Sequence, residues 1–223
     1  MFTQDTFSFL SELEQNNDRD WFKANQARYE DKVRTPALQL ITTLAPGIQA
    51  LSPRLTAVAK KVGGSLMRPQ RDSRFSADKR PYKTNVGIQF RHFQGKDVHA
   101  PGLYLHIATD GCFIGAGIWH PEAQALNAIR SCMDENPNAY RKALAQLQAG
   151  GFEMDGDKLS RPPRGYDKSH ALIDELKRKD FIATKPLSRE QILAEEFPAR
   201  LLQQFEATQA LMSYLCFALN LDY

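Results

Sequence analysis

Residues 102–119 read GLYLHIATDGCFIGAGIW, and this stretch decides the fold class. Asp110 and Gly111 form a dipeptide that is a strong signal for a two-residue β-hairpin turn. Apolar residues alternate with other residues on both sides of it, as expected for half-buried strands. A two-residue turn pairs Thr109 with Cys112, and this register predicts two antiparallel strands.

The two faces of this predicted hairpin differ in character. One face is apolar and should pack against helices. On the other face the register places His106 opposite Gly115 and Tyr104 opposite Gly117, which leaves a floor without side chains. Glycine inside a strand often marks the close approach of another backbone or of a ligand. The alternative is a helix that packs closely over the glycines.

Helical patterns surround the strands at both ends of the chain. Residues 86–90 (VGIQF) alternate like a strand, and 181–182 predict a short one. Apolar residues recur at helical spacing elsewhere. The predicted helices cover residues 6–16, 18–33, 35–51 with an interruption near Pro46, 121–134, 137–148 and 174–179, one that Ser188 begins, and one that Pro198 opens and that runs to Asn220. Helices at both ends and strands in the middle predict a single α+β domain over 1–223, with an antiparallel sheet on which the helical segments pack.

Composition and charge exclude several classes of protein. The chain has 223 residues, a net charge of +3, 42% hydrophobic residues and three cysteines, values close to those of ordinary globular domains. An odd number of cysteines without a C-x-x-C motif argues against a disulfide framework and for a reducing compartment. The N-terminus does not resemble a signal peptide, and no apolar run is long enough to span a bilayer. We therefore expect a cytoplasmic protein without a membrane partner.

The densest charge lies in residues 65–85, SLMRPQRDSRFSADKRPYKTN. Six Lys or Arg residues stand there against two Asp residues, and three of the arginines recur at every third position. The planar guanidinium group matches phosphate or carboxylate with two hydrogen bonds. Phe75 and Tyr82 lie among the charges and offer ring faces to a base or sugar. The alternative is a solvated surface in which Asp72 and Asp78 pair with neighbouring cations.

A second basic cluster occupies residues 159–170, LSRPPRGYDKSH. Its functional interpretation makes Arg164, Tyr166 and His170 a second wall of the same anion site. The alternative is a rigid loop laid across the surface, because two consecutive prolines hold an extended backbone.

Well-known catalytic motifs are missing. The chain lacks G-x-G-x-x-G after a strand, the phosphate-binding motif G-x-x-x-x-G-K-[ST], G-x-S-x-G and H-E-x-x-H. Its five histidines are scattered, so no metal site is predicted, and no cofactor is assigned. If the protein is an enzyme, His106 is the best acid–base candidate, because the unperturbed pKa of histidine lies near neutrality.

The motif blocks resemble a family of conserved hypothetical proteins found in bacteria and fungi, domain of unknown function 2461. The resemblance covers nearly the whole chain and assigns no activity. One departure is Ala171, which follows His170 where a proline is expected. The blocks that carry the resemblance are NNDRDWFKAN (16–25), RDSRFSADKRPYKTN (71–85), GLYLHI with GAGIWHPE (102–122) and RPPRGYD (161–167).

The leading hypothesis is a protein that binds a small molecule bearing phosphate or carboxylate in an Arg- and Lys-rich cleft; whether it is an enzyme stays open. The alternatives are a nucleic-acid-binding module, and a non-catalytic interaction protein whose arginines form internal ion pairs. Neither the substrate nor the oligomeric state follows from the sequence. The predicted site combines the possible acid–base residue His106 with the ligand-binding residues Arg68, Arg71, Arg74, Lys79, Tyr82, Lys83, Tyr104, Arg164 and Tyr166.

Overall fold

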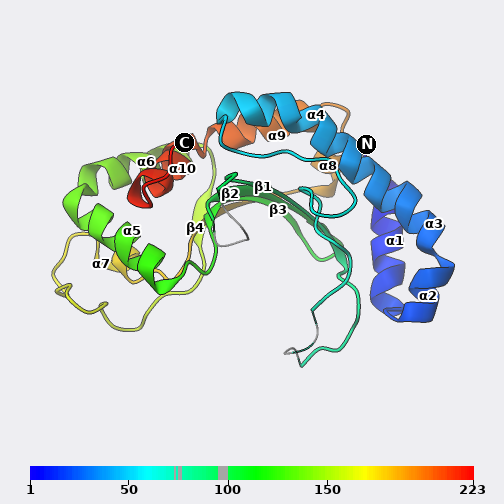
Figure 1. Ribbon diagram of the computed structural model, residues 1–223, viewed down its shortest axis with the longest axis horizontal. Helices are drawn as coiled ribbons and strands as arrows, with labels where there is room; N and C mark the ends of the chain where they lie inside the picture. The colour runs from blue at the N-terminus through cyan, green and yellow to red at the C-terminus, as the bar shows by residue number, and fades with distance from the viewer. Residues whose placement is uncertain (73, 75–76, 95–99) are drawn as a thin grey trace.

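A computed structural model describes residues 1–72, 74, 77–94 and 100–223. It confirms the α+β class, with one five-stranded antiparallel sheet in the order β1-β2-β3-β5-β4 (Figure 1). The predicted residue Phe75 lies outside the described residues. The strands are β1 (Asn85–Arg91), β2 (Gly102–Ala108), β3 (Cys112–Ile118), β4 (Glu153–Asp155) and β5 (Phe181–Leu187).

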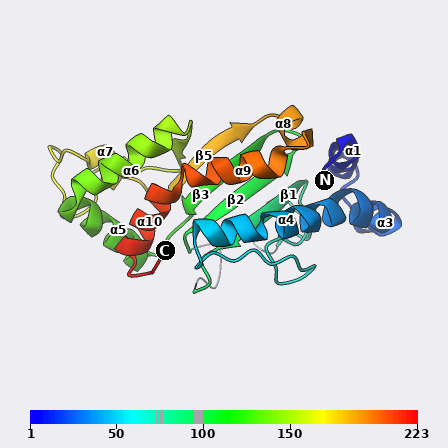
Figure 2. The ribbon, with the colours of Figure 1, turned by 90° about the horizontal axis from the view of Figure 1, so that it is seen from above.

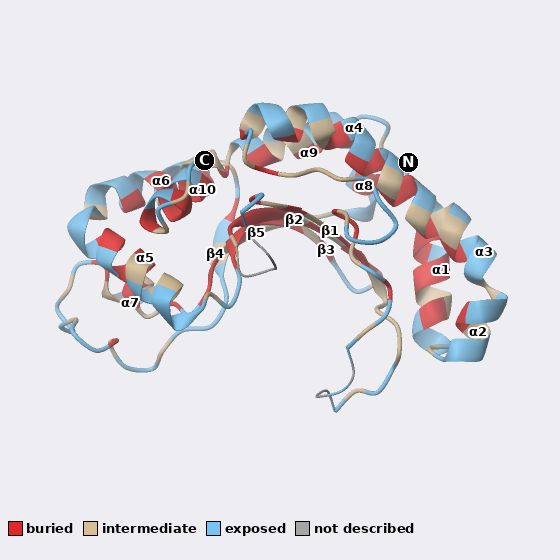
Figure 3. Cartoon of the chain, viewed as in Figure 1, coloured by how far each residue is buried: buried red, intermediate tan, exposed pale blue. Residues whose placement is uncertain are grey.

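Helices α4 (Thr35–Leu51) and α9 (Phe197–Glu206) cover one face of the sheet (Figures 1 and 2). The strands turn their apolar side chains toward this layer, and Ile88, Leu105 and Ile114 are fully buried there. Burial concentrates between the helices and this face of the sheet (Figure 3). The opposite, concave face carries no such helical layer and is the face on which the candidate site lies.

The predicted hairpin is confirmed, but its register is wrong by two residues. His106 pairs with Phe113, and Tyr104 pairs with Gly115. The two-residue turn that an Asp-Gly dipeptide favours is of type I′, which needs positive φ at its two central residues, and neither Asp110 nor Gly111 has it. Residues 109–111 instead form a longer connection between β2 and β3. Because the shift is even, each side chain stays on its predicted face.

The N-terminal segment is helical, as predicted, and stands beside the β1 end of the sheet. Asp18 caps its helix by accepting a hydrogen bond from the backbone N–H of Trp21 at 2.8 Å. Helix α4 spans 35–51 as predicted, but Thr35 is not its N-cap, because the π-helical turn η1 runs directly into it. Pro46 does not interrupt α4. The elements that precede α4 are α1 (Gln4–Gln15), α2 (Arg19–Ala24), α3 (Gln26–Tyr29) and η1 (Glu30–Arg34).

The remaining helices gather mainly at the β4 end of the sheet. The capping box at Ser188 and Gln191 is confirmed. The predicted final helix is divided at Thr208, and the predicted two-residue strand extends over seven residues as β5. The sequence did not predict β4. These helices are α5 (Ala123–Glu135), α6 (Pro137–Ala149), α7 (Ile173–Leu176) and α10 (Gln209–Ala218), with α8 (Arg189–Leu193) lying near α9.

Candidate functional site

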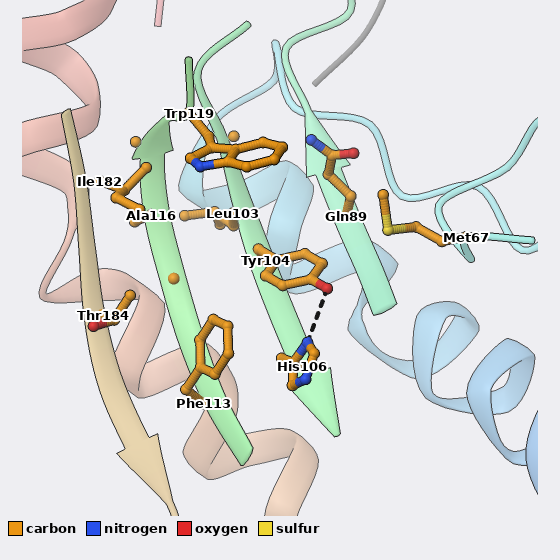
Figure 4. Close-up of a pocket in the computed structure, with 13 residues that line it drawn as sticks. Met67, Gln89, Leu103, Tyr104, His106, Phe113, Ala116, Trp119, Ile182 and Thr184 are labelled. Carbon is orange, nitrogen blue, oxygen red and sulfur yellow. Dashed lines mark hydrogen bonds between the residues drawn. The ribbon is translucent and has the colours of Figure 1, made fainter. Parts of the chain in front are cut away.

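A cavity of about 300 Å³ opens on the concave face of the sheet (Figure 4). Its side chains are mostly apolar or aromatic, and they come from β1, β2, β3 and β5, from Trp119 just after β3, and from the segment before β1. Trp119 is 50% exposed at one end of the cavity. An apolar hollow with few polar groups is typical of small-molecule sites. The lining includes Met67, Tyr104, His106, Phe113, Trp119 and Thr184.

Glycines form part of the cavity floor, as the sequence predicted, but for different reasons at different positions. At Gly117, φ is +123° and a Cβ atom would lie 2.0 Å from the carbonyl oxygen of Phe181, so the backbone requires glycine. At Gly115 a Cβ atom would come no closer than 3.7 Å to any neighbour. Gly115 is therefore not needed for packing, and its missing side chain leaves the cavity open.

His106 is held in a polar network at the cavity wall. Its Nδ1 atom lies 3.1 Å from the Tyr104 hydroxyl and 3.4 Å from the Asn85 amide nitrogen. Its ring stacks on Phe113 at 4.7 Å between centroids. Burial raises the pKa of Tyr104 to about 12, so its hydroxyl keeps its proton at neutral pH. The arrangement lets the Tyr104 O–H and the Asn85 N–H donate to Nδ1.

The same network defines which chemistry suits His106. Burial lowers the pKa of His106, although Asp110 acts in the opposite direction. A neutral imidazole that accepts at Nδ1 carries its proton on Nε2. In this state Nε2–H is the hydrogen-bond donor of the His106 ring. The acid–base role that the sequence suggested stays a hypothesis.

The basic stretch forms an arm that continues the sheet beyond β1. We define the arm as residues 65–84, of which the structure describes 65–72, 74 and 77–84. The Met67 N–H joins the arm to β1 by donating to the Gly87 carbonyl at 2.9 Å. The two halves of the arm pair through the bonds from Lys83 to Pro69 at 2.7 Å and from Arg71 to Pro81 at 2.9 Å. Met67 lines the cavity, so the arm begins at the cavity wall. Figure 1 shows the arm descending from the β1 end on the concave side of the sheet.

Tyr82 attaches the arm to the N-terminal helices instead of lining the cavity. Its ring stacks on Phe22 with centroids 3.9 Å apart. The Asn17 side chain accepts from the Tyr82 N–H and donates to the Tyr82 carbonyl, both at 3.0 Å. This two-sided attachment fixes the position of Lys83, the next residue.

Two of the predicted cations form ion pairs within the arm, and one of the two carboxylates, Asp78, is shared with Arg80. Arg71 pairs with Asp78, and Arg74 pairs with Asp72 at 2.7 Å. The Arg74 pair is exposed, so it contributes little to stability, and the Arg71 pair is partly buried. This outcome is the one that the internal-ion-pair alternative predicted for Arg71 and Arg74. Lys79 lies exposed in the same part of the arm.

Arg68 and Lys83 differ from these arginines. Within the described part of the chain, neither forms a hydrogen bond or an ion pair with a carboxylate. Burial lowers the pKa of Lys83, and repulsion from Arg68 and then from Arg71 lowers it further. Arg68 is exposed and acts on Asp72 through its charge alone, whereas Lys83 is half-buried beside two cations.

The second basic cluster does not join the first. Arg164 and Tyr166 lie on the loop that follows β4, at the opposite end of the sheet from the arm (Figures 1 and 2). Arg164 is exposed, and Tyr166 packs partly against the core. The strand order explains the separation, because the arm extends edge strand β1 while the loop follows edge strand β4. The hypothesis that both loops surround one anion is therefore wrong.

The structure also brings together two residues that the sequence analysis missed. The Nδ1 atom of His120 lies 2.6 Å from a carboxylate oxygen of Asp180, and the His120 backbone N–H donates to the same oxygen at 2.7 Å. Asp180 is 1% exposed. The His120 ring stacks on Trp119, the residue at the cavity end. The sequence signal for this pair was the position of His120 closely after strand β3 and of Asp180 directly before strand β5.

The pair is arranged in the manner of a histidine oriented by a buried carboxylate. His120 has φ of +48°, which brings its backbone N–H and its ring toward one oxygen. The other oxygen of Asp180 accepts from the Asp157 N–H at 3.3 Å. The sequence gives no local indication of this backbone conformation, which depends on the contact with Asp180.

Two further features of the described residues bear on the class of protein. No group of three or more His, Cys, Asp or Glu side chains is arranged to hold a metal ion there. Nor does that part of the chain contain a helix with the length and apolar character that crossing a membrane requires.

Comparison with curated proteins gives no match, and comparison with solved structures gives none. A family model described as conserved hypothetical protein, DUF2461, matches residues 5–214. This match spans the helical N-terminus, the sheet, the arm and both basic clusters, so the resemblance of the motif blocks is confirmed. The chain belongs to the DUF2461 family of conserved hypothetical proteins.

Proposed function

We propose that the protein binds a small molecule that has an apolar or aromatic body and a phosphate or carboxylate group. The body occupies the cavity over Gly115, between Tyr104 and Trp119. The negative group contacts Lys83 and Arg68, where the arm leaves the cavity wall. His106 donates a hydrogen bond from Nε2 to an oxygen of the same ligand.

What supports this proposal is the order of groups along the arm, because Arg68 and Lys83, which do not themselves line the cavity, lie close in the arm to Met67, which does. Met67 lines the cavity, and Arg68 follows it in the chain. Lys83 is bonded through its backbone to Pro69 on the paired half of the arm. A half-buried cation without a carboxylate is costly, and binding of an anion offsets that cost.

The two alternatives account for fewer of these features. Internal ion pairs explain Arg71 and Arg74, but they leave Lys83 unexplained. Nucleic-acid binding requires a broad basic surface, whereas the two basic clusters lie at opposite ends of the sheet and a net charge of +3 is small.

A thermal-shift screen of phosphorylated and carboxylated metabolites tests the proposal. A ligand at about 100 times its Kd stabilises the folded state by roughly 2.7 kcal/mol. For a chain of this size that corresponds to a rise in Tm of about 5–10 °C. Three variants locate the site, namely Gly115→Leu to fill the cavity, Lys83→Gln to remove the charge, and Lys142→Gln as an exposed control on α6.

We expect a ligand to raise the Tm of the wild type and of Lys142→Gln, and to have little effect on Gly115→Leu or Lys83→Gln. Equal shifts in all four proteins would place the ligand elsewhere and refute the proposal. Binding of oligonucleotides that weakens steeply with salt and is lost on removal of arm cations would favour the nucleic-acid alternative.

A further inference from the structure

The Lys83 side chain lies in an environment that differs from that of an ordinary surface lysine. Its backbone N–H donates to the Pro69 carbonyl at 2.7 Å, and the Arg71 N–H donates to the Pro81 carbonyl at 2.9 Å, so Lys83 lies across the arm from the segment that carries Arg68 and Arg71. Burial lowers the pKa of Lys83, and the guanidinium groups of Arg68 and Arg71 lower it further. The carboxylate of Asp78 is bonded to Arg71. Lys32 provides the contrast, because Asp5 and Asp31 pair with it and raise its pKa.

We propose that Lys83 is a nucleophilic lysine that condenses with the carbonyl group of an anionic oxo compound, such as an oxo acid or a phosphate-bearing aldehyde. This inference deepens the anion-binding function proposed above and rests on it. A lysine that is partly desolvated and lies next to other cations has more neutral amine at a given pH, and the neutral amine is the nucleophile. The neighbouring guanidinium of Arg68 supplies recognition of the negative group.

The condensation needs no reactant beyond the amine and the carbonyl compound. The nitrogen lone pair attacks the carbonyl carbon, a C–N bond forms, and the carbonyl oxygen takes up a proton. The resulting carbinolamine transfers the nitrogen proton to solvent and expels its hydroxyl group, after protonation, as water. The product is an imine between Lys83 and the ligand, and no electrons are gained or lost overall.

Reductive trapping on the full chain tests the inference. The protein is treated at pH 7 with substoichiometric glyoxylate, an aldehyde that carries a carboxylate, and sodium cyanoborohydride. Peptide mass spectrometry then measures the carboxymethyl group at each lysine. Propanal, an aldehyde without charge, is the matched control reagent, and exposed Lys142 is the reference residue.

We expect glyoxylate to label Lys83 about tenfold more than Lys142, the factor that one charge-assisted hydrogen bond to the ligand supplies. Propanal should show a smaller preference for Lys83. The Arg68→Gln variant should reduce the glyoxylate preference to the propanal level.

Equal labelling of Lys83 and Lys142 by glyoxylate would overturn the inference. So would a preference that is the same for both aldehydes and survives Arg68→Gln, because the anionic group would then play no part. If thermal-shift ligands depend on Gly115 but glyoxylate shows no preference for Lys83, the proposed function stands and the nucleophilic role fails. If Lys83 is labelled preferentially but no thermal-shift ligand depends on Gly115, the inference stands and the cavity part of the proposed function fails.

Discussion

Substituting the two glycines of the cavity floor distinguishes the effect of filling the cavity from the effect of straining the backbone. Gly115 and Gly117 lie two residues apart on β3, and both line the cavity. A Cβ atom at Gly115 would meet the Ala183 carbonyl oxygen at 3.7 Å and the Tyr104 Cβ at 3.8 Å, which are ordinary contacts. At Gly117 the new atom would lie 2.0 Å from the Phe181 carbonyl oxygen, on a backbone with φ of +123°.

These distances give opposite predictions for stability. Replacing a strand glycine with alanine restricts the unfolded chain, so Gly115→Ala should stabilise the fold by about 0.5–1 kcal/mol. For a chain of this length the expected rise in Tm is about 1–4 °C. Gly117→Ala forces an unfavourable backbone conformation and a clash with backbone, so it should destabilise the fold by more than about 3 kcal/mol.

Urea unfolding followed by circular dichroism measures both changes. Gly115→Leu completes the series, because it should remain within about 1 kcal/mol of wild type while it fills the cavity and abolishes ligand binding. Equal destabilisation by Gly115→Ala and Gly117→Ala would refute the reasoning, since it would mean that the cavity floor is closed at Gly115.

Three other substitutions test the groups around the site. Arg178 and Tyr140 lower the pKa of Glu175 despite its burial, so Glu175→Gln should cost about 3 kcal/mol at pH 7. The difference in unfolding free energy between wild type and Glu175→Gln should be full above pH 4.5, the ordinary pKa of glutamate, and should disappear as the pH falls below it. Urea titrations at several pH values measure this difference, and a difference that does not change with pH would contradict the prediction. Asp180→Asn should lower the free energy of unfolding by about 2 kcal/mol and change the ¹⁵N chemical shift of His120 Nδ1, which loses the carboxylate as its hydrogen-bond partner; an unchanged spectrum would count against the pair. Asn17→Ala removes two hydrogen bonds to the arm, so it should cost about 1–2 kcal/mol and weaken ligand binding; unchanged affinity would show that the attachment of the arm does not position Lys83.

The sequence predicted those parts of the fold that depend on local patterns. Alternation in 102–118 identified the apolar and open faces correctly, because strand periodicity alone decides them. The register failed because it was inferred from the dipeptide at Asp110, whose backbone follows a different turn. β4 escaped prediction because three residues are too few to show a period, and it is defined by its pairing with β5.

The sequence predicted correctly those site residues that lie close to one another along the chain. His106 and Tyr104 were found together because residues two apart on a strand share a face. His120 and Asp180 were missed because they are 60 residues apart and meet through the pairing of β3 with β5. The grouping of Arg164 with the arm failed for the same reason, since only strand order decides which loops are neighbours.

The central claim is that a small anionic molecule occupies the cavity between Tyr104 and Trp119. The chain has two tryptophans, so a Trp21→Phe variant leaves Trp119 as the fluorescent reporter at the cavity end. Titration of this variant with the best thermal-shift ligand should move the emission of Trp119 to shorter wavelength and reach saturation. The response should vanish when Gly115→Leu is added. Ligand binding of full strength with unchanged Trp119 emission, or the same response with Gly115→Leu, would contradict the claim.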